Sequence, residues 1–89
     1  MKKIIVSQRL DKIISRGEYR DNLDIKIIEF TQKLSLMPIS LSNGLSNTSK
    51  FLSIIKPKGA IITGGGNPKI KNLRYKNEIN LIKYCIKFK

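Results

Sequence analysis

The chain of 89 residues contains no histidine, no tryptophan and one cysteine. One cysteine excludes an internal disulfide, and a Cys/His metal site is not expected without histidine. The apolar runs are only three or four residues long, whereas a membrane-spanning helix needs about 20. The apolar stretch after Lys2 and Lys3 ends at Ser7, too early for a signal peptide. We therefore expect a cytoplasmic protein with no metal, no cofactor and no membrane partner.

Acidic residues are also scarce, since six of them face 18 basic residues and the net charge is +12. Such a charge can bind nucleic acid or another polyanion. However, the 14 lysines accompany 16 isoleucines and seven asparagines, a profile that A/T-rich codons produce by themselves. The basic residues are scattered apart from two groups, Lys56 with Lys58 and the segment 69–76, and no RNA-stacking motif is present. A small basic module for nucleic acid or another polyanion is therefore the alternative function, and nucleic acid is not the favoured partner.

Alternating apolar segments predict an α/β fold. Apolar, β-branched runs predict strands at residues 3–7, 37–41 and 59–63. Apolar residues at helical spacing predict helices at residues 21–34, 46–56 and 75–88. The polar segment 8–20 contains Gly17 and is predicted to be a loop. The order β-α-β-α-β-α predicts a short parallel sheet between helices.

Local signals refine these elements. Pro38 cannot donate to a ladder, so its strand should begin there or lie at a sheet edge. Asp21 and Asp24 favour the start of the first helix, and Ser46 or Asn47 should cap the second. Two sets of residues each fall on one apolar face of the first and last helices: Leu23, Ile27, Phe30 and Leu34, and Ile79, Ile82 and Ile86.

The strand at 59–63 ends in Gly64-Gly65-Gly66 and forms the first candidate site. Ligands of open α/β sheets bind beyond the carboxyl ends of strands, where glycine lets a backbone N–H approach a substrate. No Gly-Lys-Ser/Thr follows, and the glycines are contiguous, so neither a P-loop nor a dinucleotide fingerprint is present. The turn is either a ligand site or only a tight exit from the strand.

A second candidate is the polar segment, whose Gln8, Arg9, Tyr19 and Arg20 should lie near the carboxyl end of the first strand. The arginines could bind a carboxylate or phosphate. Alternatively, they form internal salt bridges with acidic neighbours, which are Glu18, Asp21 and Asp24. Cys85 has no histidine to activate it and is interpreted as a small, half-buried hydrophobic residue.

Four segments, in this order and covering nearly the whole chain, carry a family resemblance: Ile5-Val6-Ser7-Gln8-Arg9, Glu18-Tyr19-Arg20-Asp21-Asn22-Leu23-Asp24, Met37-Pro38-Ile39 and Gly59-Ala60-Ile61-Ile62-Thr63-Gly64-Gly65. Together they resemble the N-terminal part of class I glutamine amidotransferase-like proteins. The γ-glutamyl hydrolase (peptidase C26) type is the most similar of these. The first loop and the Gly-Gly turn are the specific parts, whereas the helices are generic.

The resemblance implies a truncated flavodoxin-like three-layer sandwich. It also implies a hydrolase or amidotransferase reaction, in which a cysteine thiolate attacks glutamine or another γ-glutamyl amide and a Cys-His-Glu triad completes the site. Gly65, with Gly64 beside it, resembles half of the oxyanion hole. Gln8, Arg9, Tyr19 and Arg20 would border the same cleft.

The chain departs from the family pattern in its catalytic residues. It ends at Lys89, before the expected nucleophile elbow, and it has no histidine. Gly66-Asn67-Pro68 stands where the relatives carry Asn-Asp, and Cys85 lies one element too early to be the nucleophile. Residues 1–89 are therefore expected to be an incomplete domain, inactive alone. They would come from a split or frame-shifted gene or be a remnant, and the missing C-terminal half is a candidate partner as a separate chain.

Overall fold

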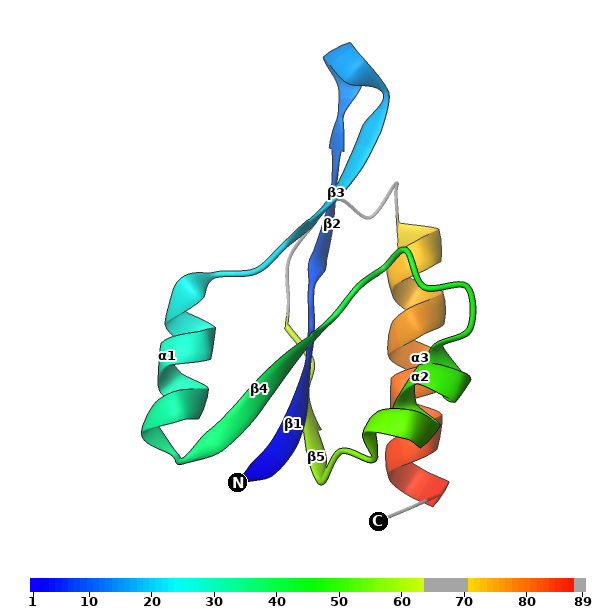
Figure 1. Cartoon of the computed structure of the whole chain (residues 1–89). Helices are drawn as coiled ribbons and strands as arrows, with labels where there is room; N and C mark the ends of the chain where they lie inside the picture. Colours follow the sequence, from blue (N-terminus) through cyan, green and yellow to red (C-terminus); the bar gives the residue numbers. More distant parts are fainter. Residues whose placement is uncertain (64–70, 88–89) are drawn as a thin grey trace.

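A computed structural model of the chain describes residues 1–63 and 71–87, with side chains for 71–77 excepted. Its centre is a parallel sheet of three strands in the order β4-β1-β5 (Figure 1). These strands are β1 (Lys2–Ser7), β4 (Leu36–Leu41) and β5 (Gly59–Ile61). The three predicted strands are therefore present, and β4, which contains Pro38, pairs with β1 alone and lies at an edge.

The prediction of a loop at residues 8–20 was wrong, because most of this segment forms an antiparallel hairpin. Strand β2 (Arg9–Ile13) pairs with β3 (Glu18–Asn22), and a short 3-10 turn, η1 (Ile14–Arg16), joins them. Gly17 closes the turn at φ 62°, a left-handed conformation that suits glycine. The hairpin extends beyond the carboxyl end of the sheet (Figure 1). Polar residues on both strands concealed it, since an exposed two-stranded ribbon needs no apolar alternation.

Three helices follow in the predicted order: α1 (Ile25–Lys33), α2 (Thr48–Ile55) and α3 (Lys71–Lys87). Helix α1 lies on one side of the sheet, and α2 and α3 lie together on the other (Figure 1). Helix α1 begins later than predicted because Asp24 is its N-cap, with Oδ1 accepting from the Lys26 amide at 2.9 Å. Of the two predicted caps of α2, Ser46 and Asn47, it is Asn47 that caps the helix, and its Oδ1 accepts from the Lys50 amide at 3.0 Å. The fold is a small α/β domain with helices on both faces of a parallel sheet.

A cluster of four fully buried side chains joins the sheet to α2 and α3. Ile5 of β1 and Leu41 of β4 pack against Leu52 of α2 and Leu81 of α3. Cys85 is half-buried and packs against this cluster, which confirms its interpretation as a structural residue. Helix α3 therefore contributes to the core from Leu81 to Cys85.

In two helices the most buried residue lies beside the apolar face that the sequence indicates. In α1 the fully buried residue is Thr31, whose hydroxyl donates to the Ile27 carbonyl at 2.6 Å, while the Phe30 side chain is 57% exposed. Among the described side chains of α3, residues 78–87, Leu81 is buried, and Ile82 and Ile86 are exposed. Periodicity specifies an apolar stripe, but the neighbouring elements decide which of two adjacent stripes is covered. None of the helices in the described part of the chain could cross a bilayer, on grounds of length and hydropathy.

Replacing Lys56 with glycine should stabilise the fold. Lys56 is the C-cap of α2 at φ 53°, and its amide donates to the Leu52 carbonyl at 2.8 Å. Glycine adopts this left-handed conformation without the Cβ clash, so we expect Lys56→Gly to raise the free energy of unfolding by about 0.5–1 kcal/mol. The measurement is the urea midpoint. The control is Lys58→Gly, at a position without positive φ, which should lower stability, and a decrease in both variants would contradict the expectation.

Candidate functional site

A cleft of about 600 Å³ opens at the carboxyl ends of β1 and β5. It is lined by Arg9, Asn22, Leu23, Asp24, Ile27, Ile61, Ile62 and Thr63. The chain leaves β1 toward α1 on one face of the sheet and leaves β5 toward α3 on the other (Figure 1). Ligands of open α/β sheets bind where the connections after two adjacent strands run to opposite faces of the sheet. The position of the cleft makes it the candidate site.

Two hydrogen bonds hold Thr63, just after β5, against the carboxyl end of β1, and a third ties β1 to α3. The Thr63 amide donates to the Ser7 hydroxyl at 2.9 Å, and the Thr63 hydroxyl donates to the Ser7 carbonyl at 3.0 Å. The Ser7 hydroxyl in turn donates to Oε2 of Glu78 in α3 at 3.0 Å. Ser7 is only 2% exposed. Its hydroxyl is thus committed to fixing Thr63, the residue before the glycines, rather than to attacking a substrate.

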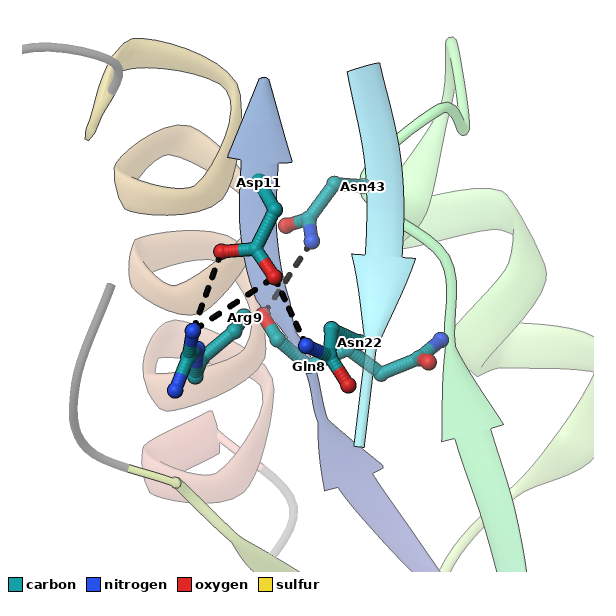
Figure 2. Close-up of polar contacts among 5 residues, drawn as sticks. All are labelled: Gln8, Arg9, Asp11, Asn22 and Asn43. Atoms are coloured by element: carbon teal, nitrogen blue, oxygen red, sulfur yellow. Dashed lines mark hydrogen bonds and ion pairs between the residues drawn. The ribbon is translucent and has the colours of Figure 1, made fainter. Parts of the chain in front are cut away.

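Arg9 stands at the mouth of the cleft, and its position depends on Asp11 and Asn22 (Figure 2). Its Nη2 donates to both carboxylate oxygens of Asp11, at 3.2 and 3.5 Å. The side-chain Nδ2 of Asn22, on the opposite strand, donates to the same carboxylate at 2.7 Å. Within the described residues these contacts use one guanidinium nitrogen, and the Arg9 side chain remains 46% exposed. The other N–H groups of Arg9 can therefore donate to a bound anion.

A separate network anchors the hairpin to the loop after β4. The Asp21 carboxylate accepts from the Asn43 amide nitrogen at 3.0 Å, from its side-chain Nδ2 at 2.9 Å and from the Ser42 hydroxyl at 2.7 Å. Asn43 also donates to the Gln8 carbonyl at 3.1 Å (Figure 2). The Gln8 side chain donates to the Leu41 carbonyl at 3.1 Å. Asn43 is buried, so this network positions the base of the hairpin beside the cleft.

Of the six residues predicted for the site, which are Gln8, Arg9, Tyr19, Arg20, Gly64 and Gly65, only Arg9 is found among the residues that line the cleft. Arg9 lines the cleft, whereas Gln8 holds β1 to β4. Arg20 pairs with Glu18 at 2.8 Å, as the salt-bridge alternative anticipated, and Tyr19 lies 5.6 Å from the Lys12 ammonium. Tyr19 and Arg20 are not among the residues that line the cleft. Gly64 and Gly65, the predicted oxyanion-hole glycines, lie outside the described residues.

Sequence reasoning missed Asn22, Asp24 and Thr63 as lining residues. Asn22 and Asp24 flank Leu23 where the hairpin leads into α1, but an Asp before an apolar helix signals a cap first. Asp24 does act as the cap, through Oδ1, and it also faces the cleft. The cleft thus contains a guanidinium and a carboxylate. Among residues 1–63 and 78–87, no group of three or more Cys, Asp or Glu side chains could hold a metal ion.

Removing the Asp21 carboxylate should loosen the hairpin. Asp21→Ala removes two hydrogen bonds of the buried Asn43 and one of Ser42, and unpaired buried polar groups cost about 1–3 kcal/mol. We expect a loss of that size in the free energy of unfolding, measured by urea titration. The matched control is Glu18→Ala on the same hairpin, which breaks an exposed ion pair and should cost less than about 1 kcal/mol. Equal losses would show that Asp21 is no anchor.

Neither models of protein families, nor curated proteins, nor solved structures match this chain when compared with it. The family resemblance is thus carried by the quoted sequence segments alone. The site is described from the chain's own geometry, which is a cleft at the carboxyl ends of the parallel strands β1 and β5.

Proposed function

We propose that the chain is the N-terminal part of a cytoplasmic, class I glutamine amidotransferase-like protein of the γ-glutamyl hydrolase type. Its role is to supply one wall of a site for glutamine or another γ-glutamyl compound. The cleft at the carboxyl ends of β1 and β5 is the observation that carries this proposal. A flavodoxin-like extension of the sheet beyond β5 belongs to the same proposal.

The charged groups of the cleft suit the zwitterionic end of an amino acid. Arg9 offers free guanidinium N–H groups, which bind carboxylates well. Asp24 uses Oδ1 for the helix cap, and its other carboxylate oxygen is available to an ammonium group. Both line a cleft whose remaining wall is largely apolar, namely Leu23, Ile27, Ile61 and Ile62. This combination favours a ligand with an α-amino acid head and an aliphatic chain.

The chain lacks the groups that would break the amide bond. It contains no histidine, and its one cysteine is half-buried against the core. The Ser7 hydroxyl is buried and engaged with Glu78. In the proposal, Gly65 and Gly64 contribute oxyanion-hole donors, and the Cys-His-Glu triad comes from a missing C-terminal half supplied as a separate chain.

The free edge of β5 is where that half would add. Among the described strands, β5 pairs only with β1. An apolar groove of about 450 Å³ lies between β5 and α3, lined by Gly59, Ala60, Ile62, Leu81, Ile82, Cys85 and Ile86. An unpaired strand edge beside an apolar groove favours the addition of another strand. The exposure of Ile82 and Ile86, two apolar residues on one face of α3, is explained if this addition covers them.

Binding of L-glutamine to the cleft tests the proposal. In a ¹⁵N-HSQC titration of the whole chain, we expect shifts at Asn22, Asp24 and Thr63, with no release of ammonia. Arg9→Gln should weaken this binding about tenfold or more, because it removes a charge-assisted pair.

Arg20→Gln is the matched control, because Arg20 lies on the same hairpin, pairs with an acidic residue two positions away and is similarly exposed. It should leave binding unchanged. Absence of any shift at the cleft, or an equal loss in both variants, would refute the assignment of the site. Release of ammonia by the chain alone would refute the proposal that the catalytic triad comes from a separate chain.

A further inference from the structure

The amino-terminal end of the sheet contains a second cleft, of about 570 Å³, surrounded by lysines. Its lining comprises Met1, Lys2, Lys3, Leu34, Ser35, Leu36, Lys56 and Lys58. The fold creates this group, because residues at the beginning of the chain meet residues 56–58. The Lys58 amide donates to the Lys3 carbonyl at 2.8 Å, and β1 pairs with β5 from the next residue on. Lysines that look scattered in the sequence are thus neighbours in space.

No acidic side chain balances this group. None lines the cleft, and in the described part of the chain both ion pairs lie on the hairpin. The acidic residues other than Glu29 occur on the hairpin, at the start of α1 or against Ser7, toward the opposite end of the sheet. Lys2, Lys56 and Lys58 are exposed. The four lysines therefore form a group of positive charge at the amino-terminal end of the strands, and no acidic residue lines their cleft.

The cleft also contains both non-glycine residues with positive φ among the described residues, Ser35 at 58° and Lys56 at 53°. Each follows the end of a helix, where glycine would fit with less strain. Lys56 thus has a charged side chain at a position whose backbone conformation favours glycine. A lysine at position 56 can neutralise the negative carboxyl end of α2. The same effect does not explain Lys2, Lys3 and Lys58, which lie at or just before the beginnings of strands.

We propose that this lysine cleft binds the phosphate backbone of a single-stranded nucleic acid without reading its sequence. The inference is independent of the glutamine site, which lies at the other end of the sheet. Lysines act as point charges and suit phosphate contacts that need no fixed geometry. No aromatic residue lines the cleft, so base stacking makes no contribution. A concave site fits a narrow strand better than a flat lipid surface.

Salt dependence gives the first test. With one phosphate contact for each of the four lysines, the affinity for a fluorescein-labelled oligodeoxythymidine should fall roughly 50-fold between 50 and 200 mM salt, because each contact on a single strand contributes a slope of about 0.7. Fluorescence anisotropy measures this affinity. No binding at 50 mM salt would overturn the proposal.

Two variants of equal charge separate a site from diffuse attraction. The first replaces Lys2, Lys3, Lys56 and Lys58 with glutamine, and the second replaces Lys12, Lys26, Lys50 and Lys83, which are exposed residues outside the cleft. The cleft variant should lose most of its salt dependence and bind at least about tenfold more weakly at low salt. The control variant should stay within about threefold of the parent. Equal losses would overturn the proposal and indicate attraction by net charge alone.

Lys56→Gly separates binding from folding, because it is expected to stabilise the chain while it weakens binding and reduces the salt slope by about 0.7. Circular dichroism verifies that all variants are folded. Retention of full affinity by Lys56→Gly would remove Lys56 from the site and overturn the assignment. Vesicles containing anionic lipid provide the last comparison, and binding to them in preference to the oligonucleotide would replace nucleic acid with a membrane surface and overturn the proposal.

Discussion

The structure depends on β1 more than on any other element. This strand is the centre of the parallel sheet and pairs with β4 on one side and β5 on the other. Ile5 and Val6 are fully buried, so the strand contributes to packing on both faces. Its last residue, Ser7, fixes Thr63 at the end of β5. Both clefts are built at the ends of this strand, one beyond its carboxyl end and one around Lys2 and Lys3.

The two ends of the sheet differ in chemistry because parallel strands and their returning helices run in opposite directions. The carboxyl ends of β1 and β5 meet the beginning of α1 and the hairpin, where the acidic residues occur. The amino ends meet the ends of α1 and α2, where lysines are unopposed. A mixed-charge cleft and a purely cationic cleft therefore share one small domain. This division allows a glutamine-type ligand and a polyanion to be proposed for separate sites.

The hairpin shows how tertiary contacts decide what local pattern leaves open. Arg9, Asp11 and Asn22 form a polar cluster across its two strands, and Asp21 ties its base to Asn43. None of these contacts joins sequence neighbours, except Arg9 with Asp11. The segment was predicted as a loop because it has too few apolar residues for a core strand. Polar pairs across the two strands stabilise the hairpin, and the periodicity of the sequence gives no sign of such pairs.

The sequence by itself determined the three parallel strands, the three helices and the structural role of Cys85, and it narrowed the cap of α2 to Ser46 or Asn47, because short apolar runs and capping residues act locally. Only the tertiary structure decided that Leu81, rather than Ile82 and Ile86, enters the core. It alone brought Arg9 and Asp24 to one cleft and gathered Lys2 and Lys3 beside Lys56 and Lys58. The physical reason is common to these cases: strand register and helix rotation are set by packing against distant segments, and composition contains no information about those neighbours.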